Sequence, residues 1–309
     1  MRRTYILLAA AALITLGALV AVLAASTSRR HSSGKLAVTA SFYPMAEFAR
    51  QVGGSLVSVQ TLVRPGIEPH DYDPTSRDIA RTYDSRVFIH NGAGLEAWAD
   101  KLSPELQRAG VTVVKASQGI DLHPKDASDT ENIGATDPHV WMDPVLAQQE
   151  VTAVKNGLSR ADPAHRAAYQ ANAVRYLAQL QALDASFRAG LQQCSVHTII
   201  TSHQAFAYLG ARYGFTAAGI AGLSPDNEPS PAKLADIAAL VRRQHVHYIF
   251  FETLVSPKLA QTIAQETGAQ TLAFNPLEGL TTRQQDAGQN YLSIQKDNLQ
   301  ALRTALHCQ

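Results

Sequence analysis

The chain lacks an excess of charge of either sign. It has 309 residues, with 27 basic and 26 acidic side chains and a formal net charge of +1. Such a balance provides no electrostatic footprint for nucleic acid or for an anionic membrane surface. Charged residues make up 17% of the chain and apolar residues 46%, which is typical of globular rather than disordered proteins. The length is sufficient for two medium-sized domains, each with its own core.

Cysteine is scarce, with only Cys194 and Cys308 in the whole chain. Because exported proteins meet oxidising conditions, a Cys194–Cys308 disulfide is our hypothesis. It would pin the last helix to the first strand of the second domain. Two unpaired thiols are the alternative.

A long hydrophobic run occurs at the N-terminus. A basic pair, Arg2-Arg3, precedes an apolar stretch that ends in small residues suitable for signal peptidase at Ala25. The stretch is also about long enough to span a bilayer. A cleaved signal peptide over residues 1–25 is favoured over an uncleaved N-terminal anchor, and lipid attachment is unsupported because no cysteine lies nearby. Both alternatives place the folded part outside the cytoplasm, on the periplasmic or extracellular face of the membrane.

From Lys35 onward, predicted strands and helices alternate, which favours parallel sheets with helices on both faces. The predicted strands cover residues 36–40, 57–62, 87–90, 111–115, 197–201, 215–220, 247–251 and 271–274. The predicted helices outside the long one described next cover residues 44–52, 74–83, 95–102, 145–158, 204–213, 231–244, 257–267 and 288–306.

One long helix is predicted between the two halves, with Asp162 as its N-cap and Pro163 at its first position. Its apolar stripe recurs at spacings of three and four: Tyr169, Ala173, Tyr176, Leu180, Leu183, Phe187 and Leu191. A helix of roughly 43 Å, at about 1.5 Å per residue, outspans one domain of this size. We therefore expect two parallel-sheet α/β lobes joined by a long rigid helix. The expected parts are a flexible tether at 26–35, an N-terminal lobe at 36–160, a linking helix at 161–192 and a C-terminal lobe at 193–309.

Four short segments each offer a metal donor in a stiff, turn-like setting. The donors are His70, His139, His203 and Glu278. Three imidazoles and one carboxylate complete a tetrahedral shell for zinc. All four lie near strand ends or helix starts, where ligands bind in parallel α/β proteins, and two precede the long helix while two follow it. They are therefore predicted to meet in a cleft between the lobes.

Each donor also has an ordinary structural role open to it. His70 would be a solvated loop residue, His139 a helix-entry residue, and His203 a residue packed at the sheet edge. Glu278 would be solvated, since glutamate is usually exposed, and Glu252 competes with it as the carboxylate ligand. Four further residues are candidates for contacting the ligands without binding the metal themselves: His90, Glu252, Tyr43 and Trp141. His31 lies in the tether and is not expected to be a ligand.

The same segments resemble a known family. From Lys35 to Cys308 the chain is similar to the zinc- and manganese-type solute-binding proteins of bacterial ABC importers. The resemblance is carried by residues 39–44, 66–74, 137–144, 202–209, 220–225, 250–254 and 275–280. It implies two α/β lobes joined by a long helix, and it assigns the metal ligands to His70, His139, His203 and Glu278.

The resemblance implies capture of a metal outside the cytoplasm by a monomer, and delivery to an ABC permease with its ATPase. The metal would be cargo, so no enzymatic activity is expected. Three nitrogens and one carboxylate favour Zn²⁺ over Mn²⁺, which prefers oxygen-rich shells. Zinc-specific members often carry a His-rich loop in the first domain, whereas residues 117–137 contain only His123.

Four alternatives remain open from the sequence. The chain could bind manganese, or act as a metal-binding surface adhesin. A three-His metallohydrolase would need an open coordination position and a general base, for which Glu252 is the obvious candidate, but there is no His-Glu-x-x-His helix. A carrier of an organic ligand would need aromatic or arginine clamps, and the motifs offer few beyond Tyr43 and Trp141.

Overall fold

The structure is a computed structural model, and it describes residues 34–125 and 134–309. The expected leader at 1–25, most of the tether with His31, and part of the polar loop at 117–137 lie outside these residues. Leu36–Gln309 forms one compact unit. Within the described part of the chain, no helix combines the length and apolar character that crossing a membrane requires.

Two four-stranded parallel sheets organise this unit, with strand orders β2-β1-β3-β4 and β6-β5-β7-β8. The first sheet contains β1 (Leu36–Ala40), β2 (Val57–Thr61), β3 (Val87–His90) and β4 (Thr112–Lys115). The second contains β5 (Thr198–Thr201), β6 (Thr216–Gly219), β7 (Tyr248–Phe251) and β8 (Gln270–Ala273). All eight predicted strands are confirmed, with ends that differ by at most one residue. Both sheets share one topology, so each has a crevice at the carboxyl ends of its central strands.

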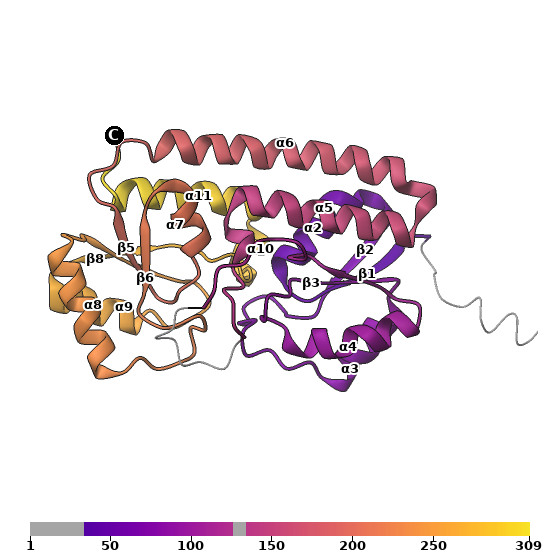
Figure 1. Ribbon diagram of the computed structural model, residues 1–309, viewed down its shortest axis with the longest axis horizontal. Coiled ribbons are helices and arrows are strands. Elements are labelled where there is room, and N and C mark those ends of the chain that lie inside the picture. Colours follow the sequence, from indigo (N-terminus) through magenta and orange to yellow (C-terminus); the bar gives the residue numbers. More distant parts are fainter. Residues whose placement is uncertain (1–33, 126–133) are drawn as a thin grey trace, which may run out of the picture. The chain divides into compact units, whose positions relative to one another are not determined.

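Helices cover both faces of each sheet (Figure 1). On the first sheet, α2 (Tyr43–Gly53) and α5 (Pro144–Ala161) lie opposite α3 (Ser76–Asp84) and α4 (Ala97–Arg108). On the second sheet, α11 (Tyr291–Ala305) lies opposite α8 (Pro231–Arg243) and α9 (Lys258–Thr267). The shorter helices are α7 (Ala207–Tyr213) and α10 (Thr282–Asp286), with 3₁₀ turns at Gly54–Leu56, Val140–Met142 and Pro163–His165.

The predicted linking helix is α6 (Arg166–Gly190), whose 25 residues extend about 38 Å. Its apolar stripe is buried from Tyr169 to Phe187. Tyr176 packs near Phe48 of α2 in the first lobe, with ring centroids 6.2 Å apart. Phe187 stacks on Tyr213 of α7 in the second lobe at 5.0 Å. The helix therefore spans the two lobes along one side, as Figure 1 shows.

Three local expectations were wrong. The side chain of Asp162 does not cap the long helix, because it pairs with the His165 ring and the Tyr169 hydroxyl instead. Helix α4 continues past Pro104 to Arg108, where buried Leu106 anchors its last turn in the core. Helix α7 begins at Ala207 rather than at residue 204, because the Gln204 N–H donates to the Gly222 carbonyl and holds the chain in a loop.

The structure contains the Cys194–Cys308 disulfide, which joins residues 114 positions apart. Main-chain hydrogen bonds run beside it, from the Val196 N–H to the Leu306 carbonyl and from the Gln309 N–H to the Gln193 carbonyl. The bridge therefore ties the end of α11 to the segment that leads into β5.

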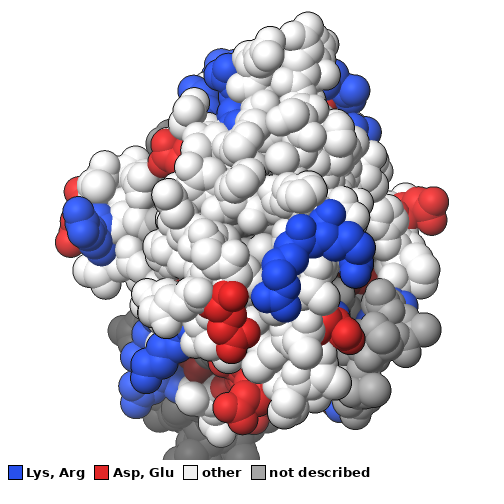
Figure 2. All heavy atoms as spheres, turned by 90° about the vertical axis from the view of Figure 1, so that its left-hand side faces the viewer, with Lys and Arg blue, Asp and Glu red and all other residues white. Residues whose placement is uncertain are grey.

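Charged side chains are sparse on the face of the second lobe shown in Figure 2. Basic and acidic groups occur in separate small patches on a mostly uncharged surface. No single sign of charge dominates this face.

Candidate metal centre

The four donors named from the sequence converge on one point. The Nε2 atom of His139 lies 3.2 Å from that of His70 and 3.3 Å from that of His203. Oε1 of Glu278 lies 3.3, 3.2 and 3.0 Å from Nε2 of His70, His139 and His203. A tetrahedral zinc shell with bonds of about 2.0–2.1 Å has edges of about 3.3–3.4 Å, so these four atoms have the spacing of a zinc site. Within the described residues, this is the only group of three or more such side chains that could hold a metal ion.

The loop that follows a strand positions each donor. His70 follows β2, His139 follows β4, His203 follows β5 and Glu278 follows β8. These loops leave the carboxyl ends of the two sheets, where parallel α/β proteins bind their ligands. In the last loop, buried Leu277 has φ 60°, a left-handed conformation that costs energy for a residue with a branched side chain. This turn directs the next side chain, Glu278, toward the three histidines.

Carboxylates orient two of the three imidazole rings. Nδ1 of His139 lies 2.8 Å from Oδ1 of Asp137, and Nδ1 of His203 lies 2.8 Å from Oε1 of Glu252. Each Nδ1 therefore carries the proton that it donates to its carboxylate, and Nε2 keeps a free lone pair pointing at the common centre. This carboxylate–histidine arrangement is typical of protein metal sites.

His70 is held differently. Its backbone N–H donates to Oε1 of Glu68 at 3.1 Å. Its ring pairs with Glu278 through Nε2, and within the described residues no carboxylate forms an ion pair with its Nδ1 as one does for His139 and His203. Burial, reinforced by the nearby Glu278 carboxylate, raises the pKa of Glu68 to about 9. The three histidines are thus unequally anchored.

The electrostatics of the cluster suit a divalent cation. Burial would lower the pKa of His203, but Glu252 and Glu278 raise it well above its usual value. Burial would likewise raise the pKa of Glu278, but His203 and the close approach of all three imidazole rings hold it well below its usual range. The other carboxylate oxygen of Glu278 is buried with no hydrogen-bond partner within the described residues. The carboxylate of Glu278 therefore stays charged at the point where the three rings meet, and a cation bound there would balance that charge.

The expected cleft is closed over the donors. His139 and His203 have no exposed surface, and Glu278 is 1% exposed. Contacts between the lobes close it: the Gly66 N–H donates to the Leu280 carbonyl at 2.9 Å, and the Tyr208 hydroxyl donates to the Asp137 carbonyl at 2.8 Å. The site therefore lies at a sealed seam between the lobes.

Two of the four predicted supporting residues contact the donors. Glu252 bonds to His203 as described, and the Trp141 ring lies 5.2 Å from the His139 ring. The Trp141 Nε1–H also donates to the Pro276 carbonyl at 2.8 Å, which links the His139 loop to the Glu278 loop.

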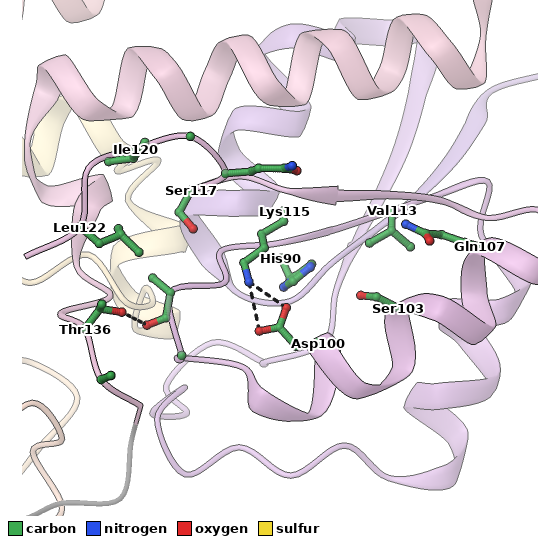
Figure 3. Close-up of a pocket in the computed structure, with 15 residues that line it drawn as sticks. His90, Asp100, Ser103, Gln107, Val113, Lys115, Ser117, Ile120, Leu122 and Thr136 are labelled. Atoms are coloured by element: carbon green, nitrogen blue, oxygen red, sulfur yellow. Dashed lines mark hydrogen bonds and ion pairs between the residues drawn. The ribbon is translucent and has the colours of Figure 1, made fainter. Parts of the chain in front are cut away.

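The other two supporting candidates lie elsewhere. Tyr43 faces Glu47 and Tyr291. His90 stacks on Phe88 and lines a separate cavity of about 650 Å³ between β3, β4 and α4 (Figure 3). The ion pair between Lys115 and Asp100, at 3.0 Å, crosses that cavity. Neither residue has a contact with the four donors.

Sequence reasoning missed Asp137 and Glu68 as parts of the site. Oδ1 of Asp137 accepts both the backbone N–H of His139 at 2.9 Å and the His139 ring N–H at 2.8 Å. The signal was an acidic residue two positions before each of two histidines, at Asp137 and at Glu68. Aspartate often accepts hydrogen bonds from the backbone two residues on, so this spacing was readable.

The sequence of the chain also matches a known protein family. The family described as zinc-uptake complex component A, periplasmic (ZnuA), matches residues 38–305. This chain belongs to the ZnuA family.

The share of a relative's length that this chain matches differs between members of the family. The high-affinity zinc uptake system protein ZnuA of Bacillus subtilis is 39% identical over 280 residues, which is 88% of each chain. The zinc-binding lipoprotein AdcA of Streptococcus pneumoniae is 36% identical over 289 residues, which is 91% of this chain and 58% of AdcA. The chain thus spans nearly all of one relative and little more than half of the other.

Solved structures share the ZnuA-family fold. The crystal structure of Zn(II)-bound AdcA from Streptococcus pneumoniae has a TM-score of 0.79 at 37% identity, covering 88% of this chain and 58% of that chain. The laminin-binding protein Lmb of Streptococcus agalactiae has a TM-score of 0.80 at 33% identity, covering 88% of this chain and 99% of that chain. The two-lobed α/β fold with a long connecting helix is therefore the fold of this family.

Proposed function

We propose that this protein binds Zn²⁺ outside the cytoplasm and delivers it to an ABC-type permease and its ATPase for uptake. His70, His139, His203 and Glu278 are the proposed ligands. The observation that carries the proposal is the set of distances of 3.0–3.3 Å among the three Nε2 atoms and one carboxylate oxygen. Membership of the ZnuA family and the relatives named for zinc binding support the cargo and the transport role.

Zinc rather than manganese is the proposed cargo. Three imidazole nitrogens and one carboxylate oxygen match the donors and the tetrahedral spacing of zinc, whereas manganese prefers oxygen-rich sites with more ligands. A shell filled by four protein ligands leaves no position for an activated water, so we propose that the protein is not a hydrolase.

The proposed organisation keeps the expected boundaries: lobes at 36–160 and 193–309, joined by 161–192. We propose that the protein is exported, on the basis of the apolar N-terminal run and the periplasmic description of the family, and that it acts as a monomer. A second candidate role is adhesion, because Lmb, at 33% identity, is described as a bifunctional protein with adhesin and metal transporting activity. Binding of the purified protein to immobilised laminin tests that role.

Metal analysis tests the main proposal. Protein purified without added metal is expected to contain close to one equivalent of zinc, and a chelator competition is expected to give a much higher affinity for Zn²⁺ than for Mn²⁺. Zinc binding weaker than micromolar, or a preference for manganese, would refute the proposal.

The carboxylates that hold the His139 and His203 rings are expected to affect zinc affinity, although they are not proposed ligands. Asp137→Asn and Glu252→Gln should each lower zinc affinity by about 10- to 100-fold, because the charge that orients the ring and strengthens its lone pair is lost. Competition titrations against a chelator measure this. Asp162→Asn is the matched control, since Asp162 pairs with the exposed ring of His165 at 2.7 Å in the same way. An equal loss in the control variant would show that the effect is general.

Zinc affinity is also expected to rise with pH between about 5.5 and 8. A proton and zinc compete for the same imidazole nitrogens, so acid weakens binding and binding releases protons. Because Glu252 and Glu278 raise the pKa of His203, this competition should extend to neutral pH. Titrations in a series of buffers at each pH measure both the affinity and the protons released. An affinity that stays constant down to pH 5.5 would contradict this expectation.

A further inference from the structure

Three polar side chains form a stripe on the buried face of α11. They are Tyr291, Gln295 and Asn298, and spacings of four and three residues place them on one side of the helix. Tyr291 and Gln295 are fully buried, and Asn298 is 2% exposed. Burying amide groups is unfavourable unless they are hydrogen-bonded, so their bonding partners indicate what the stripe does.

The first two members of the stripe hold the His139 loop. The Tyr291 hydroxyl donates to the Trp141 carbonyl at 2.6 Å. The Gln295 Nε2 donates to the Met142 carbonyl at 2.9 Å and contacts the Tyr291 oxygen at 3.3 Å. These two carbonyls belong to the short 3₁₀ turn that directly follows His139.

The third member holds the Glu278 loop. Oδ1 of Asn298 accepts from the Asn275 N–H at 2.9 Å, and its Nδ2 donates to the Asn275 carbonyl at 2.8 Å. The Asn275 side chain in turn accepts from the Leu277 N–H at 2.7 Å. Asn298 therefore clamps the base of the strained turn that carries Glu278.

We propose that this stripe on α11 sets the separation between His139 and Glu278, and so the size of the ion that the site retains. The inference rests on the proposed function, because it assigns Tyr291, Gln295 and Asn298 as positioning residues for zinc. One loop comes from the first lobe and the other from the second, and a single rigid helix bonds to both. None of the three side chains touches a proposed ligand, so each acts through the main chain of a loop.

The position of α11 supports this role. Its first turn reaches the first lobe, where the Tyr291 ring packs on Phe48 of α2 with centroids 5.4 Å apart. Its body lies over the second lobe beneath α6 (Figure 1). A loop held at its carbonyls on a rigid helix cannot spread to a larger shell without breaking buried hydrogen bonds, and this favours a small tetrahedral ion over a larger one.

The test uses near-isosteric variants that remove only polar contacts: Tyr291→Phe, Gln295→Met and Asn298→Leu. Each is expected to speed zinc dissociation about 5- to 10-fold, as the loss of one or two hydrogen bonds predicts, and to narrow the preference for Zn²⁺ over Mn²⁺. The rate is measured by transfer of zinc to an excess of chelator. Asn172→Leu is the matched control. Asn172 lies near the start of α6, and its Nδ2 donates to the Val52 carbonyl of α2 at 2.8 Å.

Double variants separate positioning from general loosening. Tyr291→Phe should have no further effect on zinc affinity when combined with His139→Ala, because it acts through that histidine, yet it should keep its effect when combined with Glu278→Gln. Asn298→Leu should show the reverse pattern. A merely structural role would instead add the same loss in every background.

The outcomes of these experiments distinguish a failure of the proposed zinc-binding function from a failure of the positioning role of the α11 stripe. A wild-type protein that does not hold zinc tightly would refute the proposed function, and this inference with it. A wild-type protein that holds zinc, with stripe variants that release it no faster than Asn172→Leu, would refute the inference alone. If Asn298→Leu fails to fold, as judged by urea unfolding of the metal-free protein, Tyr291→Phe decides the question because it removes a single oxygen atom.

Discussion

His139→Ala is expected to lower zinc affinity by about 100- to 1,000-fold. Zinc binding by four protein ligands supplies about 10–16 kcal/mol, so one ligand accounts for roughly a quarter of it. Nε2 of His139 lies within 3.2–3.3 Å of the donor atoms of His70, His203 and Glu278. A competition titration with a fluorescent zinc chelator measures the change.

The fold of this variant should persist without metal. His139 lies in a loop between β4 and α5, and both elements have their own places in the core. His165→Ala is the control, because His165 is half-exposed and lies in the turn before α6. A zinc affinity of His139→Ala within tenfold of the wild type would rule out His139 as a ligand.

Removing the disulfide is expected to cost about 2–5 kcal/mol of unfolding free energy. In the chain-entropy model, a bridge that closes a loop of 114 residues restricts the unfolded chain by up to about 5 kcal/mol, and measured values are often smaller. The variant Cys194→Ser/Cys308→Ser, unfolded in urea beside the oxidised wild type, gives the difference. Reduced wild-type protein should match the variant.

Mass spectrometry under non-reducing conditions checks the premise of that experiment. The wild type is expected to show no free thiol, because both cysteines are in the bridge. Two free thiols in the folded protein, or a stability loss below about 1 kcal/mol in the double variant, would mean that the bridge contributes little.

Much of the fold could be read from periodicity. The stripe from Tyr169 to Phe187 predicted α6, and the alternation of short apolar runs with helical stretches predicted the strands of parallel sheets. Helix α10 was missed although Thr281 and Gln284 form a capping box. Its five residues are too few for an apolar period to develop.

The sequence predicted the metal ligands better than the residues that position them. His70 and His139 each follow a proline, and His203 follows the end of a predicted strand, so all three histidines stand out in the sequence. Gln295 and Asn298 could not be found, because polar residues on a C-terminal helix normally indicate a solvated face. Only the packing of α11 against loops from both halves of the chain buries them. Tyr43 and His90 were also proposed, but Tyr43 faces Glu47 and Tyr291 and His90 stacks on Phe88.

The unequal anchoring of the three histidines predicts the order in which the bonds to the metal form and break. His139 and His203 are each braced by a carboxylate, whereas the ring of His70 has no such brace within the described residues. Residues 64–67, which lie just before His70 in the chain, are exposed. The bond from zinc to His70 should therefore be the last to form as zinc enters and the first to break as it leaves. Zinc would then enter and leave the site on the side of residues 64–67.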